Sequence, residues 1–315
     1  MPERAAGARA DLFLATRFRT LSRTAAARAI RQGEVTSATR PLKPSSTLKV
    51  GERLHVGIAG FAPDGPPPPF PTILHEDDTV LVISKPSGLL VHPAGDRWAW
   101  AVIGMVKDAR PDHRVDLVHR LDRDTSGVLV LTKDHATNAW LKQQFRQRSE
   151  ALNKSYLAVV RGLPDWETRE IDAPMGDHEA SEVRLRRCVR ADGQVARTTV
   201  RVVERMPARG LSLVACRIHT GRTHQIRVHL EHVGLPILGD KLYGHSDDVF
   251  LEWLESGATP RVRAAAGFPR QCLHAWQLKL PLPDGATIQL EAPLPADLQA
   301  LVDGAPPTWP PEEPP

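Results

Sequence analysis

The pattern of hydrophobic and polar positions predicts a chain built mostly of short strands, with helices between some of them. The unbroken apolar run at 79–84 and the run at 128–131 are typical of buried strands bounded by turns. Alternating or largely apolar segments predict further strands at 154–162, 211–218 and 273–280. Turn signals across 165–210 predict a meander of antiparallel strands.

Helical spacing appears after the strand at 128–131. Asp134 is placed to cap a helix that runs to Arg146, with Trp140, Leu141 and Phe145 recurring on one side. We expect Trp140 and Phe145 to be core residues rather than platforms for nucleic-acid bases. Further helices are predicted near Met105, within 245–271 and after Pro295.

The first 60 residues form a separate pattern. Ser22 is placed to cap a helix that carries Ala25–Ala27 and Ile30, and Gly33 is placed to end it. Val35 begins a short β segment, and a turn after Leu48 leads to a closing strand. A small α/β module is therefore predicted over residues 10–60.

Proline marks the next boundary. The segment 61–71 contains four consecutive prolines, which favour an extended spacer and cannot continue a helix or a central strand. We therefore expect a linker at 61–71, a larger domain at 72–303 and a disordered Pro- and Glu-rich tail at 304–315.

Composition excludes several classes of protein. The 315 residues have ordinary apolar and charged fractions, and no apolar run approaches the roughly 20 residues that span a bilayer. The first 20 residues lack a secretory apolar core. Cys188, Cys216 and Cys272 form no redox or metal-binding spacing. We expect a cytoplasmic protein that does not bind membranes.

Charge is distributed unevenly along the chain. Residues 1–57 hold eleven Lys or Arg against four Asp or Glu, so this segment has a net charge of +7. The whole chain has a net charge of +4, so the remaining residues sum to −3. A basic N-terminal module joined to a near-neutral remainder indicates that the module binds a polyanion electrostatically. The alternative is a solvated basic face without a partner.

Candidate chemistry concentrates in 118–133, which reads VHRLDRDTSGVLVLTK. Asp122 has two interpretations: a loop aspartate that caps a turn, or a carboxylate held ionised by arginines and directed at a substrate. The residues alone favour the turn cap. A second dense segment, HTGRTHQIRVHLEH at 219–232, contains four histidines, but no Cys or carboxylate spacing completes a metal site.

The motif HRLD, two residues and TSG at 119–127 resembles the signature of the RluA-type pseudouridine synthase family. The segments DDTVLVISKPSGLLVHPA, KSYLAVVRG and TGRTHQIR resemble the same family in the same order, and Gly239-Asp240 and Tyr243-Gly244 follow as expected. Residues 10–57 resemble the S-four-like RNA-binding domain, with a departure at 37–39, where an Asn-Gly turn is usual.

The resemblance implies an α+β fold: a mixed, mainly antiparallel sheet with flanking helices, plus a small α/β RNA-binding domain. It implies an isomerase that converts uridine to pseudouridine in RNA without a cofactor or a metal. Asp122, Tyr156 and Arg227 would be catalytic. The expected substrate-binding residues are Arg120, His119, Thr125, Arg222 and His224.

The expected partner is RNA, with ribosomal RNA favoured and tRNA as an alternative, and we expect a monomer. An ion pair with Arg227 would orient Asp122 and favour its ionised form. The carboxylate could attack the ribose anomeric carbon or remove a ribose proton to give a glycal, and the sequence leaves both routes open. The functional alternative is a catalytically silent RNA-binding or ribosome-assembly factor.

Overall fold

The computed structural model describes residues 7–17, 21–57, 68–92, 101–110, 112–147 and 151–310. It divides the chain into two units, of which one comprises Met1–Phe70 and Leu90–Ala109 and the other Pro71–Leu89 and Arg110–Pro315. Most of the predicted linker (61–67) and the last part of the predicted tail (311–315) lie outside the described residues. The domain boundaries at 60, 72 and 303 remain predictions.

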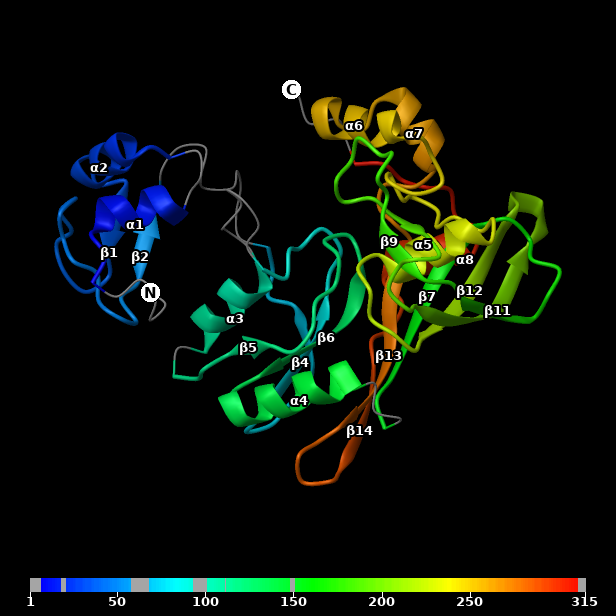
Figure 1. Cartoon of the computed structure of the whole chain (residues 1–315), viewed down its shortest axis with the longest axis horizontal. Helices are drawn as coiled ribbons and strands as arrows, with labels where there is room; N and C mark the ends of the chain where they lie inside the picture. Colours follow the sequence, from blue (N-terminus) through cyan, green and yellow to red (C-terminus); the bar gives the residue numbers. More distant parts are fainter. Residues whose placement is uncertain are drawn as a thin grey trace. The chain divides into compact units, whose positions relative to one another are not determined.

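The first unit contains the helix predicted after Ser22, the short strand predicted at Val35 and a closing strand (Figure 1). Its elements are α1 (Ala10–Arg17), α2 (Arg23–Arg31), β1 (Val35–Ser37), β2 (Leu54–Val56) and α3 (Val102–Ala109). The Ser22 side chain accepts a hydrogen bond from the Ala25 N–H, so Ser22 is the cap predicted for α2. β1 and β2 pair antiparallel, and Leu14, Ile30 and Leu48 are among the residues that form a buried core.

The second unit is built on one large sheet, which has ten strands among the described residues. Its main path, in spatial order, is β3 (Thr72–Glu76), β4 (Val80–Lys85), β6 (Ser126–Thr132), β13 (Leu273–Pro281), β7 (Asn153–Arg161), β12 (Leu211–Ile218), β11 (Arg197–Met206) and β8 (Thr168–Asp172). β5 (Asp116–Leu117) pairs with β6, and β14 (Thr287–Glu291) pairs with β13. Only β6 and β13 pair in parallel within this sheet, which confirms the mixed, mainly antiparallel α+β fold.

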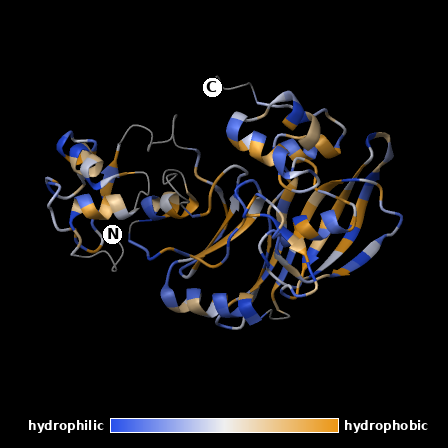
Figure 2. Cartoon of the chain, turned by 45° about the horizontal axis from the view of Figure 1, so that its top comes forward, coloured by the Kyte–Doolittle hydropathy of each residue, from blue (hydrophilic) through white to orange (hydrophobic). Residues whose placement is uncertain are grey.

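The hydrophobic pattern explains which strands are central. Every residue of β6 is buried, as the apolar run predicts, whereas β11 alternates between buried and more exposed positions. Figure 2 shows this difference as nearly continuous orange in the inner strands and alternating orange and blue in the outer ones. The inner strands therefore form a rigid platform, and the segments that leave their ends are held in place by it.

Helices and a small hairpin complete the second unit. The remaining elements are α4 (His135–Gln147), β9 (Met175–Asp177), β10 (Arg187–Val189), a 3-10 turn (Pro207–Arg209), α5 (Gln225–His232), α6 (Asp247–Ser256), α7 (Pro260–Ala266) and α8 (Ala296–Val302). Asp134 caps α4 by accepting from the Thr137 N–H at 2.8 Å. Trp140 and Phe145 pack against the core, so their expected role as core residues is confirmed.

Two local features add to the sequence pattern. Within the tail predicted over 304–315, the Arg263 guanidinium carbon lies 5.4 Å from the centre of the Trp309 ring. This cation–π contact gives the segment a partner that its composition does not reveal. In addition, β6 begins at Ser126, so the loop that carries Asp122 is shorter than the sequence pattern indicates.

Gly127 explains how β6 and β13 come together at that point. It has φ +109°, and a Cβ atom added there would lie 2.1 Å from the Ala275 carbonyl oxygen, its partner in the parallel pair. A side chain at 127 would therefore force the two strands apart where the Asp122 loop ends and β6 begins.

We expect Gly127→Ala to lower the free energy of unfolding by on the order of 3 kcal/mol, because it combines a disfavoured φ with a backbone clash. Gly104→Ala in α3 is the matched control: its added Cβ meets no atom within 4 Å, and alanine favours a helix. Urea unfolding of both variants tests this. Equal stability of the two variants would contradict the role given to Gly127.

Candidate active site

Asp122 lies on the short loop between β5 and β6, and other segments anchor this loop from outside. The Lys85 Nζ donates to the Arg123 carbonyl at 2.8 Å, and the Ser87 hydroxyl donates to the Asp124 carbonyl at 2.8 Å. Gln271, just before β13, donates to the Thr125 hydroxyl oxygen at 2.6 Å. Lys85, Ser87 and Gln271 therefore fix the three residues that follow Asp122 in the loop.

Lys85 is a structural residue of this anchor. It is fully buried, and its Nζ donates to three carbonyl oxygens, those of Pro86, Leu89 and Arg123, at 2.8–2.9 Å. Burial lowers the pKa of Lys85 to about 7, while the charges of Asp124 and Asp122 act in the opposite direction. Three acceptors match the three N–H bonds of an ammonium group. The sequence gives no chemistry to Lys85, and the structure places it under the loop.

Asp122 is joined to Arg227 of α5, which lies 105 residues later in the chain. The Arg227 Nη1 donates to Asp122 Oδ2 at 3.0 Å. The Asp122 side chain is 28% exposed and that of Arg227 only 9%. Within the described part of the chain, the other carboxylate oxygen makes no hydrogen bond. The ion pair thus orients the carboxylate and leaves one oxygen available to a substrate.

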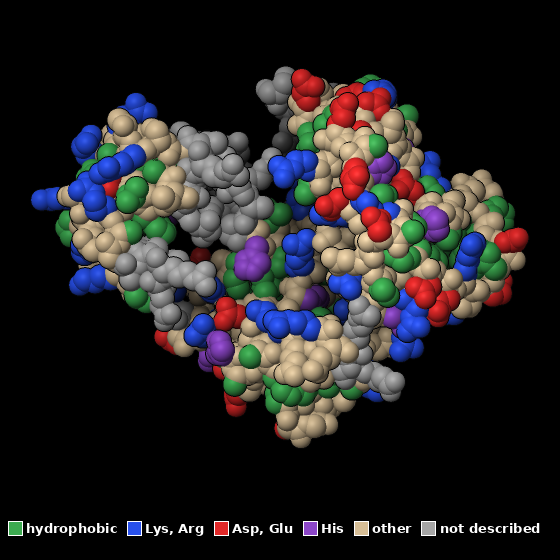
Figure 3. Space-filling view, in the orientation of Figure 1, with side chains coloured by type: hydrophobic (Ala, Val, Ile, Leu, Met, Phe, Trp, Pro, Cys, Tyr) green, Lys and Arg blue, Asp and Glu red, His purple; other side chains and the backbone are tan. Residues whose placement is uncertain are grey.

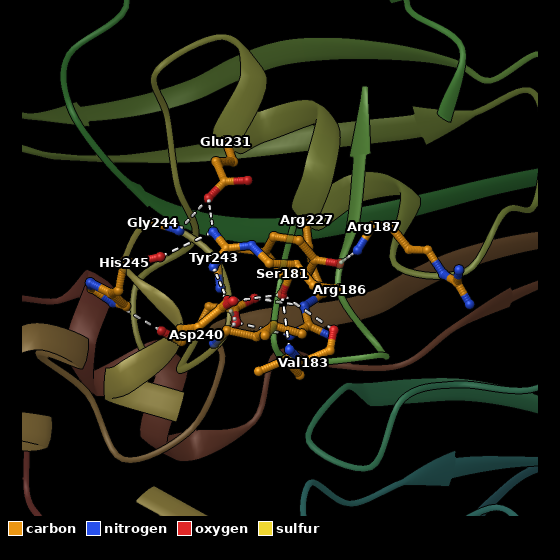
Figure 4. A network of polar contacts seen from close by, with 12 residues as sticks. Ser181, Val183, Arg186, Arg187, Arg227, Glu231, Asp240, Tyr243, Gly244 and His245 are labelled. Atoms are coloured by element: carbon orange, nitrogen blue, oxygen red, sulfur yellow. Dashed lines mark hydrogen bonds and ion pairs between the residues drawn. The ribbon is translucent and has the colours of Figure 1, made fainter. Parts of the chain in front are cut away.

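A second carboxylate holds Arg227 from the other side (Figure 4). Asp240 has no exposed side-chain surface and binds Arg227 with two hydrogen bonds, Nε to Oδ2 at 2.6 Å and Nη2 to Oδ1 at 2.9 Å. The Asp240 Oδ1 also accepts from the backbone N–H groups of Leu242 and Tyr243. Although burial opposes ionisation of Asp240, Arg227 and these N–H groups lower its pKa.

Tyr243 closes the site above the guanidinium. The Arg227 guanidinium carbon lies 4.7 Å from the centre of the Tyr243 ring, so the cation is packed against an aromatic face. The Tyr243 hydroxyl accepts from the Arg187 N–H at 3.0 Å. Burial raises the pKa of Tyr243, so the phenol keeps its proton at neutral pH. Arg227 is therefore fixed by Asp240 and Tyr243 and directs one nitrogen at Asp122.

Figure 4 shows that this centre continues into a wider network of polar contacts. Arg186 binds Asp247 at 2.7 Å and Glu231 at 3.2 Å, and Glu231 also accepts from the Gly244 N–H. These contacts tie α5, α6 and the segment after Asp240 together. The segment that supplies Asp240 and Tyr243 is thus held independently of Arg227.

His224 is a strained residue within this cluster. It caps α5 with φ +60°, and it is the only non-glycine residue with positive φ in the described ranges. Its Nδ1 lies 2.9 Å from the Tyr243 hydroxyl, and its Nε2 lies 3.9 Å from Asp122 Oδ2. Burial and the charge of Arg227 lower the pKa of His224 to about 4. The imidazole is therefore neutral, with one nitrogen at the Tyr243 hydroxyl and the other facing Asp122.

Tyr156 lies in the middle of β7 and is 8% exposed. It pairs across the sheet with Cys216 and Ala275, which fixes the strand around it. Burial and the negative charge of Asp122 raise the pKa of Tyr156. At neutral pH the side chain is therefore a protonated phenol beside the carboxylate, and no resting phenolate base is present.

A small pocket of about 90 Å³ collects these residues. Seven of the eight residues expected at the site line it: Arg120, Asp122, Thr125, Tyr156, Arg222, His224 and Arg227. Among them, Thr125 is almost completely buried and already accepts from Gln271, so it supports the loop. Arg120 is exposed, and Arg222 donates to the Val195 carbonyl at 3.1 Å.

The structure does not bring His119 into the pocket. Its Nε2 accepts from the Val130 N–H at 3.2 Å, and its ring stacks on Phe145 with centres 5.0 Å apart. Burial and the charge of Lys154 lower the pKa of His119 to about 3. His119 therefore joins the motif loop to β6 and α4, and we do not retain it as a substrate-binding residue.

Several supporting residues escaped sequence reasoning. The sequence places Asp240 and Tyr243 within the family pattern without assigning them a role, and it gives no signal for Gln271. Gln225 is buried and makes hydrogen bonds to Thr220, Arg197 and other groups of the turn before α5. The only available signal was their position inside or next to the matched motifs, because side-chain partners far apart in sequence are visible only in the fold.

Among the described residues, no group of three or more His, Cys, Asp or Glu could hold a metal ion. Three of the four histidines of 219–232 have separate partners: His219 contacts Thr199, His224 contacts Tyr243, and His229 contacts Thr198 and the Ala173 carbonyl. Within the same ranges no helix is long and apolar enough to cross a membrane.

Comparison with solved structures defines the class of the fold. The human RNA pseudouridylate synthase domain containing 4 is 28% identical, with a TM-score of 0.57, over 74% of this chain and 92% of that one. The human RNA pseudouridylate synthase domain containing 1 is 23% identical with a TM-score of 0.56, which supports the fold alone. The second unit thus has a pseudouridine synthase fold.

Sequence comparison then gives the family. A family model described as RNA pseudouridylate synthase matches residues 79–232. Ribosomal large subunit pseudouridine synthase D of Xanthomonas campestris is 38% identical over 96% of this chain and 90% of that protein. Ribosomal large subunit pseudouridine synthase C of Escherichia coli K12 is 35% identical over 92% and 90%. The chain belongs to the RluA-type family of RNA pseudouridine synthases, which are isomerases.

The depressed pKa of His224 predicts acid sensitivity. Between pH 6.5 and 4 the unfolded chain binds a proton at this residue that the folded chain excludes, so stability falls as the pH falls. The slope from one such group approaches about 1.4 kcal/mol per pH unit. We expect His224→Asn, which tolerates positive φ, to reduce the loss of unfolding free energy between pH 6.5 and 4.

The exposed His135 offers a control, because His135→Asn removes an imidazole without touching the site. Urea unfolding at four pH values between 4 and 7 gives the slopes. If His224→Asn and the wild type lost stability equally over this range, the buried neutral imidazole would be refuted.

Proposed function

We propose that this protein isomerises uridine to pseudouridine in large-subunit ribosomal RNA, with Asp122 as the carboxylate that reacts with the ribose. The observation that carries the proposal is the 3.0 Å ion pair between the partly exposed Asp122 and the buried Arg227. The substrate is supported by the names of the two bacterial relatives, both ribosomal large subunit pseudouridine synthases. A ribosomal RNA substrate also supports the expected cytoplasmic location.

The reaction conserves the atoms of the uridine. The bond between N1 and the anomeric carbon breaks, the uracil rotates, a bond forms from carbon five, and the proton of carbon five is replaced by one on N1. No external oxidant or reductant enters this balance, so the reaction needs no redox cofactor. Asp122 must be ionised for either route, attack on the anomeric carbon or removal of a ribose proton.

The residues around Asp122 suit the steps before and after bond cleavage. The target uridine must leave its stack, which costs a few kcal/mol, before it can reach the pocket. Arg120, exposed beside Asp122, is suited to fill the vacated space because its planar guanidinium stacks on bases. Tyr156 would pack against the uracil as a neutral phenol, and His224 would contact the substrate through Nε2.

The N-terminal unit would add affinity through its basic helix. Figure 3 shows Lys and Arg side chains gathered over this unit. Arg23 and Arg40 are bound to the buried carboxylates of Asp11 and Glu52, whereas Arg28 and Arg31 of α2 are exposed and make no ion pair in the described part of the chain. These two would be available to RNA phosphates.

Tritium release from RNA labelled at carbon five of uridine tests the proposal. With ribosomal RNA transcripts we expect release by the wild type and a fall in kcat of at least ~10³-fold for Asp122→Asn, because the amide can neither attack nor accept a proton. RNA binding by the variant should persist. A tRNA transcript run in parallel tests the alternative substrate.

Asp124→Asn is the matched control, since Asp124 lies on the same loop but pairs with Arg123 outside the pocket. It should keep kcat within about tenfold of the wild type. Binding of either RNA without any tritium release by the wild type would instead favour a silent RNA-binding factor.

A further inference from the structure

A second, larger pocket of about 640 Å³ adjoins the candidate active site. Ile218, at the end of β12, lines both pockets. The charged or titratable residues in its wall are Lys154, Asp172, Arg197, Arg217 and His219. None of these residues has a role in the proposed reaction.

Lys154 links this pocket to the position of the target base. It lies two residues before Tyr156 on β7, so the two side chains leave the same face of the sheet about 7 Å apart along the strand. A Cβ atom placed on Gly221 would lie 3.7 Å from the Lys154 Nζ, so the turn that carries Arg222 passes close to the amine. A strand of RNA that enters the active site would therefore pass next to Lys154.

Lys154 lacks a counter-charge in the described structure. Its Nζ lies 4.9 Å from the centre of the Phe145 ring, and no carboxylate in the described ranges forms an ion pair with it. Burial lowers the pKa of Lys154 to about 8, so the amine is still mostly protonated at pH 7. An anion bound beside it would restore the interactions that burial removes.

The rest of the wall is also positive. Arg217 is exposed and makes no ion pair within the described residues, and Arg197 approaches Glu170 only at 3.9 Å with both side chains about half exposed. Such an exposed pair contributes little. Burial and the charges of these two arginines lower the pKa of His219, which is neutral at pH 7. Asp172 is the one carboxylate in the described wall, against three cations.

We propose that this pocket binds a phosphodiester group of the RNA strand next to the target uridine, with Lys154 as the central contact and Arg217 and Arg197 at the rim. The proposal rests on the proposed function, because it takes the RNA substrate as given. It adds a site that holds the strand while the uridine turns into the adjoining pocket.

The chemistry of the wall favours a phosphate over a base. The Phe145 ring is already engaged by His119 and Lys154, so it is not free to stack on a nucleobase. Ammonium and guanidinium groups bind phosphate oxygens without reading sequence. The pocket should therefore contribute affinity and salt dependence equally for any sequence around the target.

The test measures RNA binding at several salt concentrations together with tritium release. We compare wild type, Lys154→Gln, Lys154→Arg and Arg217→Gln on a ribosomal RNA transcript. The control is Lys279→Gln, which removes an equal charge from an exposed position of β13 outside the pocket wall. Thermal melting shows whether each variant is folded. Because Arg217 is exposed, Arg217→Gln should fold and still tests the proposal if Lys154→Gln is unstable.

We expect Lys154→Gln to raise Kd and KM by about tenfold, to leave kcat at saturating RNA within about threefold, and to reduce the slope of log Kd against log salt by ~0.7–1. Lys154→Arg should retain wild-type affinity, Arg217→Gln should reduce the slope, and Lys279→Gln should not. An unchanged slope in both Lys154→Gln and Arg217→Gln would overturn the proposal. Failure of the wild type to release tritium would refute the synthase function alone, since the salt slope reports the phosphate contact without turnover.

Discussion

The candidate site depends on one buried ion pair, the two-point contact between Asp240 and Arg227. Burying a guanidinium away from water costs free energy unless its N–H groups are hydrogen-bonded. One carboxylate that binds through both oxygens satisfies two of these N–H groups. The third nitrogen is then directed at Asp122. The orientation of the Asp122 carboxylate is thus determined through Arg227 by Asp240, which does not contact Asp122.

The surrounding structure holds the two ends of this contact in place. Asp240 is fixed by backbone N–H groups and by the network around Glu231 and Arg186, while Arg227 lies on a helix whose cap, His224, is itself bonded to Tyr243. On the other side, Lys85 holds the Asp122 loop. Because the anchors come from several separate segments of the chain, movement of the carboxylate would require several buried hydrogen bonds to break together.

Sequence reasoning succeeded where local patterns decide the outcome. Apolar runs located β4 and β6, and Ser22 and Asp134 located helix starts, because capping and burial act within a few residues. Motif resemblance located Asp122, Tyr156 and Arg227, which now lie in one pocket. His119 lies outside this pocket and stacks on Phe145, a placement that the sequence motif does not distinguish from one that faces a substrate. Asp240 holds Arg227, and Lys85 holds the loop that carries Asp122. These contacts join residues that are apart in sequence, so the sequence pattern does not reveal them.

The most direct test of this account is the effect of Asp240→Asn on single-turnover isomerisation and on the position of Arg227 in a crystal structure, with Asp247→Asn as the matched control from the same network. We expect Asp240→Asn to lower the single-turnover rate by ~10²-fold at saturating RNA, with Arg227 displaced from Asp122, because the guanidinium loses its charged partner. Asp247, which pairs with Arg186, should matter much less. A folded Asp240→Asn variant with the wild-type rate and an intact Asp122–Arg227 contact would contradict the account.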